Sequence, residues 1–149
     1  MKVYVASPLG FSEVGRAFYY NTLLPHLSSL GLEILDPWKL TEQSKIDAVA
    51  NMPYGPQKRD AWKELNKVIA DNNAKAIKQA DMIFAVLDGV DVDSGTASEI
   101  GCSFALGKRI IGYRGDFRLA GDNEGALINL QVEFFIRDSG GTIITTLAE

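Results

Sequence analysis

The sequence predicts an α/β fold in which an open parallel five-stranded sheet carries helices on both faces. Apolar, strand-like segments alternate with segments of helical periodicity along the whole chain, which is the pattern of parallel βα units. Residues 82–87 form a nearly continuous apolar run, typical of a central parallel strand that is covered on both sides. A chain of 149 residues, 46% of them hydrophobic, suits one core, and we expect residues 1–149 to form a single domain.

The first quarter of the chain predicts a strand, a helix and a second strand. Residues 2–6 are β-branched and aromatic and form the first strand. Ser12 is placed to cap the following helix, Pro25 to kink it and Gly31 to end it. A short second strand is expected at residues 32–35. These elements begin the alternation on which the fold class rests.

The middle of the chain contains its least regular segment and its longest helix. Residues 39–56 predict a loop on the substrate side with room for one short helix. Apolar spacing predicts a long helix over 57–79, ahead of the buried strand. After a polar loop, a further helix is expected over 96–106, with Gly107 as its stop signal.

The C-terminal third completes the pattern with a strand at 109–112, a helix at 122–137 and a last strand at 142–146. The order is that of flavodoxin-like sheets, in which ligands bind at the carboxyl ends of the strands. This rule selects the loops that begin at Ser7, Asp36, Asp88 and Tyr113.

Composition excludes several classes of function. The net charge of −4 provides no basic field to attract nucleic acid, and no apolar run approaches the length of a membrane span. The N-terminus lacks the apolar stretch of a signal peptide, so a cytoplasmic location is expected. The single cysteine, Cys102, and the single histidine, His26, rule out an internal disulfide and a Cys/His zinc site within one chain. Both are predicted to be structural, Cys102 as a small core residue.

The segment 88–101 concentrates chemistry, with four carboxylates at Asp88, Asp91, Asp93 and Glu99. Gly95 lets the backbone pass close to a ligand. A structural interpretation is open, since Thr96 and Glu99 fit a capping box and Asp93 or Ser94 could also cap the helix. A magnesium site is a further, less favoured reading of these carboxylates.

Several segments resemble the nucleoside 2-deoxyribosyltransferase family, in order and over nearly the whole chain. The most specific is the block Asp93-Ser-Gly-Thr-Ala-Ser-Glu99-Ile-Gly101, which follows the strand and loop of residues 80–89. Shorter matches are found at residues 3–8, 116–118, 122–124 and 129–131.

The resemblance implies a role for each matching residue. Glu99 matches the nucleophile, Asp93 the aspartate that handles the proton on the nucleobase and contacts the sugar, and Tyr4 the tyrosine that orients the nucleophile. Asn129 matches an asparagine that reaches the 5'-hydroxyl from a neighbouring subunit, which implies a homo-oligomer. Asn73 matches a base contact; some members carry Asp there, so polar recognition is expected of it and its acid–base role stays open.

Each matching residue also has a structural interpretation. Tyr4 could be a half-buried strand aromatic, Asn73 a surface helix residue and Trp38 part of the peripheral core rather than a base-stacking wall. Asn129 is expected in mid-helix, where Asn is unfavourable, which favours a specific use. Further substrate contacts are expected at the strand ends, from Ser7, Gly10, Phe11, Trp38, Asp88 and Gly95.

The implied reaction exchanges the nucleobase of a 2'-deoxynucleoside through a covalent glycosyl-Glu99 intermediate, with 2'-deoxynucleosides and free nucleobases as ligands and no cofactor. Two alternatives stay open. One is a hydrolase of 2'-deoxynucleoside 5'-monophosphates, with an anion site near Ser7, Ser12 and Arg16. The other is a non-catalytic nucleotide-binding domain on the same fold. The preference for purine or pyrimidine bases is not predicted.

Overall fold

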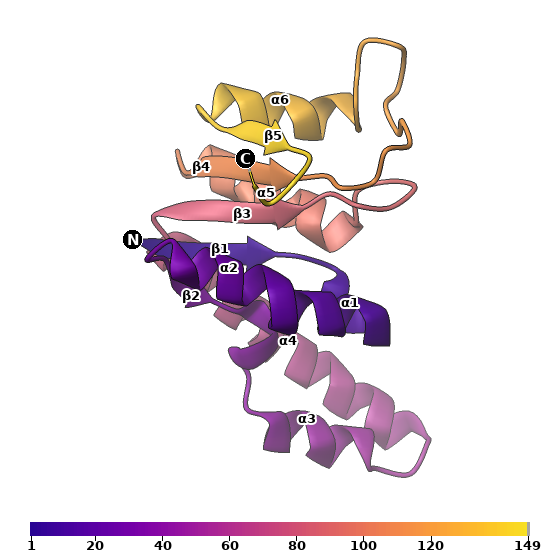
Figure 1. Cartoon of the computed structure of the whole chain (residues 1–149). Coiled ribbons are helices and arrows are strands. Elements are labelled where there is room, and N and C mark those ends of the chain that lie inside the picture. Colours follow the sequence, from indigo (N-terminus) through magenta and orange to yellow (C-terminus); the bar gives the residue numbers. More distant parts are fainter. Residues whose placement is uncertain (149) are drawn as a thin grey trace.

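Five strands form one all-parallel sheet in the computed structural model, which describes residues 1–148 (Figure 1). The strand order is β2-β1-β3-β4-β5, which confirms the predicted flavodoxin-like architecture. The strands are β1 (Lys2–Ala6), β2 (Glu33–Leu35), β3 (Met82–Val86), β4 (Arg109–Tyr113) and β5 (Thr142–Ile144). Connections leave β1 and β3 in opposite directions across the sheet, so a crevice is expected between their carboxyl ends.

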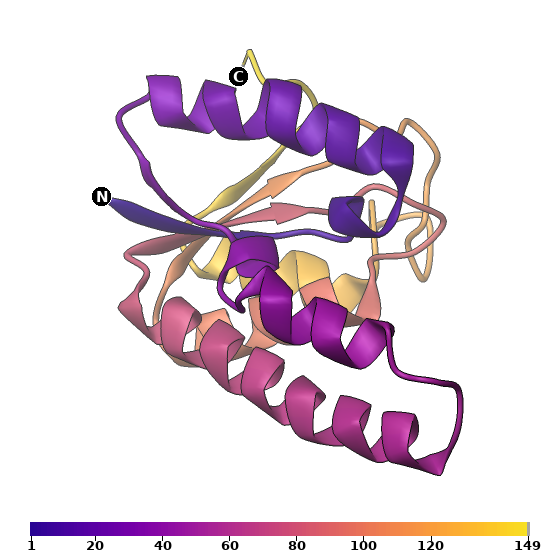
Figure 2. The ribbon, with the colours of Figure 1, turned by 90° about the horizontal axis from the view of Figure 1, so that it is seen from below.

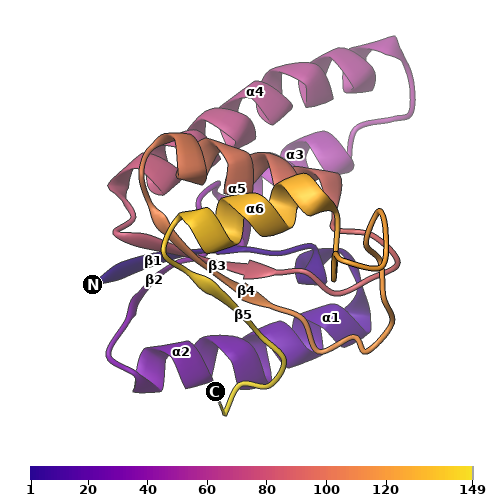
Figure 3. The ribbon, with the colours of Figure 1, turned by 90° about the horizontal axis from the view of Figure 1, so that it is seen from above.

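Helices cover the two faces unequally, as Figure 2 shows. One face carries a single continuous rod, formed by α1 (Glu13–Phe18), the π-helical turn η2 (Tyr19–Leu23) and α2 (Leu24–Ser29). The other face carries three helices, α4 (Pro56–Gln79), α5 (Ser94–Ala105) and α6 (Leu130–Asp138). Figure 3 shows α3 (Gln43–Ala50) lying along α4 outside the sheet. Two short 3-10 turns, η1 (Leu9–Phe11) and η3 (Pro37–Lys39), follow β1 and β2.

Alternation along β1 divides the core and aims one side chain at the site. Val3 and Val5 pack with the α1–α2 rod, whereas Tyr4 and Ala6 pack on the opposite side with α4, α5 and α6. All four residues are fully buried. Because Tyr4 faces α5, its hydroxyl can reach a side chain of that helix.

Most predicted elements are found, with small differences at their ends. Ser12 caps α1 by accepting a hydrogen bond from the Gly15 amide, and Gly31 ends α2 with a φ of 76°. Pro25 lies in the first turn of α2, directly after the π-helical turn. Residues 39–56 contain the short helix α3.

The helix predicted over 122–137 is wrong in its first half, because α6 begins only at Leu130. Asn129 is its N-cap and not a mid-helix residue, since its Oδ1 accepts hydrogen bonds from the amides of Gln131 and Val132. Upstream, the side chains of Asp122 and Asn123 accept hydrogen bonds from backbone amides. Such local bonds favour turns over helix.

The prediction that Cys102 is a core residue is also wrong. Its thiol is free and the residue is exposed on α5, whereas Ile100 and Ser103 on the same helix are buried. Within residues 1–148, no helix combines the length and the apolar character needed to cross a membrane.

Candidate active site

Tyr4 and Glu99 form a hydrogen-bonded pair at the centre of the sheet. The Tyr4 hydroxyl donates to Oε1 of Glu99 over 2.6 Å. Tyr4 is fully buried, so it is not the half-buried strand aromatic of the structural interpretation. Glu99 does not reach back to cap α5, as a capping box would require, because Asp93 is the N-cap. The Oε2 atom of Glu99 makes no hydrogen bond within residues 1–148.

The surroundings of this pair favour its protonated forms. Burial, and to a lesser degree the Asp93 carboxylate, raise the pKa of Glu99, while the hydrogen bond from Tyr4 opposes the rise. Burial and the neighbouring Glu99 charge raise the pKa of the Tyr4 hydroxyl far above its ordinary value. Tyr4 therefore remains a hydrogen-bond donor at any physiological pH.

Asp93 is the N-cap of α5, and it points a carboxylate toward the same site. Its Oδ2 accepts hydrogen bonds from the amide and the hydroxyl of Thr96, over 2.9 and 3.2 Å. Its Oδ1 has no partner in the described part of the chain. A Cβ atom at Gly95 would lie 3.1 Å from Oδ2 of Asp93, so the glycine gives this carboxylate its room.

A cavity of about 380 Å³ lies over Asp93 and Glu99. Its lining combines these two carboxylates with aromatic, apolar and amide side chains. Its lining consists of Ser7, Phe11, Pro37, Trp38, Asn66, Ile69, Asn73, Asp93, Gly95, Thr96 and Glu99. The residues come from the ends of β1 and β2, from α4 and from the start of α5, so the cavity opens at the carboxyl ends of the strands as the fold predicts.

Five of the expected substrate-binding residues line this cavity, and a sixth shapes it. Gly10 does not face the cavity; a Cβ there would overlap the indole ring of Trp38, so the glycine admits that ring. Those in the lining are Ser7, Phe11, Trp38, Asn73 and Gly95. The catalytic candidates Asp93 and Glu99 also line it.

Helix α4 supplies three lining residues, of which only Asn73 was predicted from the sequence. Asn66 and Ile69 lie on the same helical face, seven and four residues earlier. The spacing of these residues is present in the sequence, but only the packing of α4 against the site shows that this face of the helix lines the cavity. Asn73 is half-buried with Oδ1 shielded from solvent and without a partner, which disfavours a plain surface residue.

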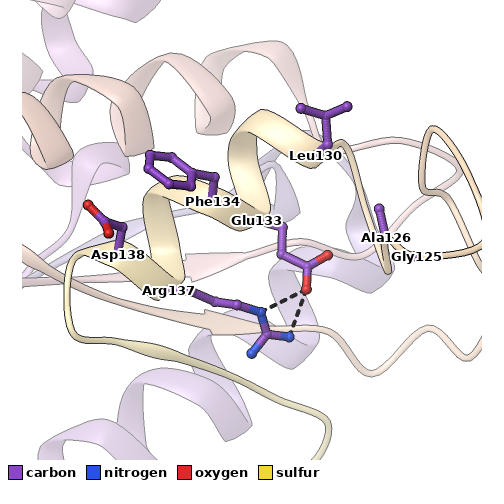
Figure 4. Close-up of a pocket in the computed structure, with 7 residues that line it drawn as sticks. All are labelled: Gly125, Ala126, Leu130, Glu133, Phe134, Arg137 and Asp138. Carbon is purple, nitrogen blue, oxygen red and sulfur yellow. Dashed lines mark hydrogen bonds and ion pairs between the residues drawn. The ribbon is translucent and has the colours of Figure 1, made fainter.

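Asp88 and Asn129, which were also predicted to bind substrate, do not line this cavity. Asp88 accepts a hydrogen bond from the Asp116 amide and ties the loop after β3 to the loop after β4. Asn129 caps α6, beside a separate surface hollow (Figure 4). In that figure Glu133 and Arg137 pair along α6, while Leu130 and Phe134 project from the helix, each 52% exposed.

Ser7, Ser12 and Arg16, which were predicted to form an anion site, are each engaged in local hydrogen bonds, and the Ser7 hydroxyl accepts one from the amide of Leu9. The Ser12 hydroxyl is used to cap α1, and Arg16 donates its hydrogen bond to the carbonyl of Gly10. No Lys or Arg lines the cavity in the described part of the chain. Nor do the carboxylates of segment 88–101 gather: residues 1–148 contain no group of three His, Cys, Asp or Glu placed to hold a metal ion.

Comparison with known proteins decides the family. Residues 3–131 match the family described as nucleoside 2-deoxyribosyltransferase. The chain belongs to this family. Membership supports a glycosyl-transferring enzyme that acts on nucleosides. No functionally curated sequence matches the chain.

Solved structures share the fold at low sequence identity. A conserved protein from Enterococcus faecalis matches with a TM-score of 0.70 and 20% identity, over 99% of this chain and 92% of its own. A 2-deoxyribosyltransferase from Bacillus psychrosaccharolyticus matches with a TM-score of 0.65 and 24% identity, over 99% and 88%. A CMP N-glycosidase from Clostridium botulinum matches with a TM-score of 0.55 and 21% identity, over 100% and 93%.

Proposed function

We propose that the chain transfers a 2-deoxyribosyl group between nucleobases by double displacement, with Glu99 as the nucleophile. The observation that carries the proposal is the Tyr4–Glu99 pair, in which Tyr4 holds one carboxylate oxygen of a Glu99 that lines a cavity shared with Asp93. A carboxylate oriented in this way suits covalent trapping of an electron-deficient sugar carbon.

In the first step, Oε2 of Glu99 attacks the anomeric carbon while the bond from that carbon to the base nitrogen breaks. The departing base takes the electron pair of that bond and a proton from the Asp93 carboxyl group. In the second step, a nitrogen of another base attacks the anomeric carbon and returns a proton to Asp93. The bond to Glu99 breaks, its carboxylate is restored, and two inversions give net retention.

The lining of the cavity suits both the sugar and the base of a nucleoside. The sugar would lie over Asp93 and Glu99, and the base would lie between Trp38 and the α4 residues Ile69 and Asn73. Because no cationic side chain lines the cavity among residues 1–148, its lining suits a neutral nucleoside better than a nucleotide. This argues against the monophosphate hydrolase, although water attacking the same intermediate would give hydrolysis.

Product analysis tests the proposal. The enzyme is incubated with a 2'-deoxynucleoside and a different free base, and the products are separated by chromatography. We expect a new deoxynucleoside and, under denaturing mass spectrometry, a protein heavier by one deoxyribosyl group at Glu99. Release of free deoxyribose alone would establish a hydrolase, and full activity in Glu99→Gln would establish that Glu99 is not the nucleophile.

A shared site in a homo-oligomer is part of the same proposal. Asn129 lies outside the cavity of its own chain, at the N-terminus of α6, where Leu130 and Phe134 are exposed. Exposed apolar residues next to a polar cap suit an interface that delivers Asn129 to a neighbouring cavity. Sedimentation of the purified protein measures the oligomeric state directly.

A further inference from the structure

Trp38 stands between two hollows of the protein surface. On one side it lines the cavity over Asp93 and Glu99. On the other it lines an open hollow of about 540 Å³, together with Tyr20, Lys39, Thr41, Glu42 and Gln43. Trp38 is the residue that the two linings have in common, so its indole ring acts as a partition between them.

The ring is held by close packing on the site side. The face of Gly10 lies against the indole so closely that a Cβ atom would overlap it. The ring of Phe11 meets the indole edge-on, with 4.8 Å between ring centroids and an interplanar angle of 89°. Such packing leaves the indole little freedom to rotate.

The backbone beneath the ring is held by a buried hydrogen-bond pair. Asp36 accepts from the Trp38 amide through Oδ1, which fixes the 3-10 turn η3 that carries the indole. The hydroxyl of Tyr19 donates to the same oxygen over 3.0 Å, and both Tyr19 and Asp36 are buried. Next to it, the Lys39 amine stacks on the ring of Tyr20, 4.8 Å from the centroid.

Both tyrosines belong to the π-helical turn Tyr19–Leu23, a rare form of helix that occurs often at functional sites. The turn thus meets η3 at two points, through Tyr19 and Asp36 and through Tyr20 and Lys39. Neither tyrosine lines the cavity over Glu99, so Tyr19 can act on the substrate only indirectly. Its hydroxyl is linked to the cavity by the hydrogen bonds that run through Asp36 to the Trp38 amide.

We infer that Trp38 determines the size of the nucleobase that the enzyme accepts, and that Tyr19 is a positioning residue that holds it there through Asp36. This inference rests on the proposed function, since it places the base in the cavity beside Trp38. Removing the indole would join the two hollows and admit bases that carry a bulky substituent.

Acceptor bases of two sizes test whether Trp38 limits the size of the nucleobase. Adenine and cytosine are compared with N6-benzyladenine and N4-benzylcytosine, as the ratio of kcat/KM for the substituted and parent base. We expect Trp38→Ala to raise this ratio for the base type that the enzyme uses, by about tenfold, the low end of the discrimination that a pocket achieves against one additional group. Trp62→Ala, in α4 and outside both linings, is the matched control. An unchanged ratio in Trp38→Ala overturns the inference.

Fluorescence tests whether Tyr19 positions Trp38, and this measurement does not depend on enzyme activity. In a Trp62→Phe background, Trp38 is the sole tryptophan. We expect Tyr19→Phe to speed acrylamide quenching of Trp38 and to raise KM roughly fivefold at unchanged kcat, the order of one lost hydrogen bond. Tyr113→Phe on β4, which also removes a tyrosine hydroxyl but lies outside both linings, should match wild type.

The two arms separate the possible failures. An enzyme with no transferase activity but faster Trp38 quenching in Tyr19→Phe refutes the proposed function and leaves the positioning role intact. Unchanged quenching in a folded Tyr19→Phe, checked by circular dichroism, refutes the positioning role whatever the activity.

Discussion

The Tyr4 hydroxyl and the Glu99 carboxylate are joined by a 2.6 Å hydrogen bond across a sequence separation of 95 residues. The contact depends on two adjacent central strands, because β1 carries Tyr4 and β3 leads through a loop into α5, which carries Glu99. Tyr4 pairs in register with Ile83, so the position of the hydroxyl is fixed by the sheet itself. The pair therefore belongs to the rigid core rather than to a mobile loop.

Tyr4→Phe should move the acidic limb of the kcat/KM profile to higher pH. The lost hydrogen bond lowers the pKa of Glu99 in the wild type, so its removal raises that pKa further. More base is then needed to ionise the nucleophile. A pH–rate profile from acid to neutral pH measures the shift; a limb that stays in place would show that Glu99 does not control it.

Asp93→Asn should move the same limb in the opposite direction. Loss of the Asp93 charge removes one of the causes that raise the pKa of Glu99. Asn caps a helix about as well as Asp, so α5 and stability should be kept. We expect kcat to fall by about 10²- to 10⁴-fold, the usual contribution of general acid–base catalysis. Near-wild-type kcat would remove Asp93 from the proton transfer.

Glu99→Gln should abolish transfer, by about 10³-fold or more, and change the pH dependence of stability. Because the folded-state pKa of Glu99 is raised, its protonated form contributes stability that is fully present below the unfolded pKa and is lost as pH rises through the folded pKa. Gln does not titrate. Urea denaturation should therefore show the free energy of unfolding of the variant rising relative to that of the wild type as the pH increases above about 4, the ordinary pKa of a glutamate.

Gly95→Ala should lower activity more than stability. The added methyl group would lie 3.1 Å from Oδ2 of Asp93 and would push that carboxylate aside. Alanine favours helix more than glycine does, by roughly 1 kcal/mol in a helix interior, so the free energy of unfolding should not fall much. Gly101→Ala on the same helix, with 3.6 Å of clearance, is the matched control for assays of kcat and thermal unfolding.

Mixing two inactive variants tests the shared site. If Asn129 serves a neighbouring cavity, Glu99→Gln and Asn129→Ser subunits that are unfolded and refolded together should regain activity, because some sites combine an intact Glu99 with an intact Asn129. Serine preserves the helix cap, so α6 should remain folded. Absence of any recovery, with mixed oligomers present, would place both residues in one subunit's site.

The parallel fold could be predicted because it depends on burial. The apolar run at 82–87 is buried on both faces only in a central strand, and the helical spacing over 57–79 places its apolar residues on one face of a helix. The start of α6 could not be predicted in the same way. Asp122, Asn123 and Asn129 all form side-chain bonds to nearby amides, and the choice of which one caps the helix is made by tertiary packing.

The site residues that lie in one sequence motif could be predicted. Those that only tertiary packing brings to the site could not. Asp93 and Glu99 lie in one block of sequence, and both line the cavity. The cap of α5 was ambiguous because Asp93, Ser94 and Thr96 all have capping side chains; the structure selects Asp93 and frees Glu99 for Tyr4. Asn66 and Ile69 enter only because α4 crosses the mouth of the cavity.

The exposure of Cys102, which was predicted to be buried, has a practical consequence. The chain's one thiol projects from the helix that carries Glu99, three residues further along, and it is exposed. A maleimide dye would therefore attach at a single known point, with no cysteine to remove and none to introduce. Its emission would report ligand binding about one helical turn from the nucleophile, in the unaltered sequence.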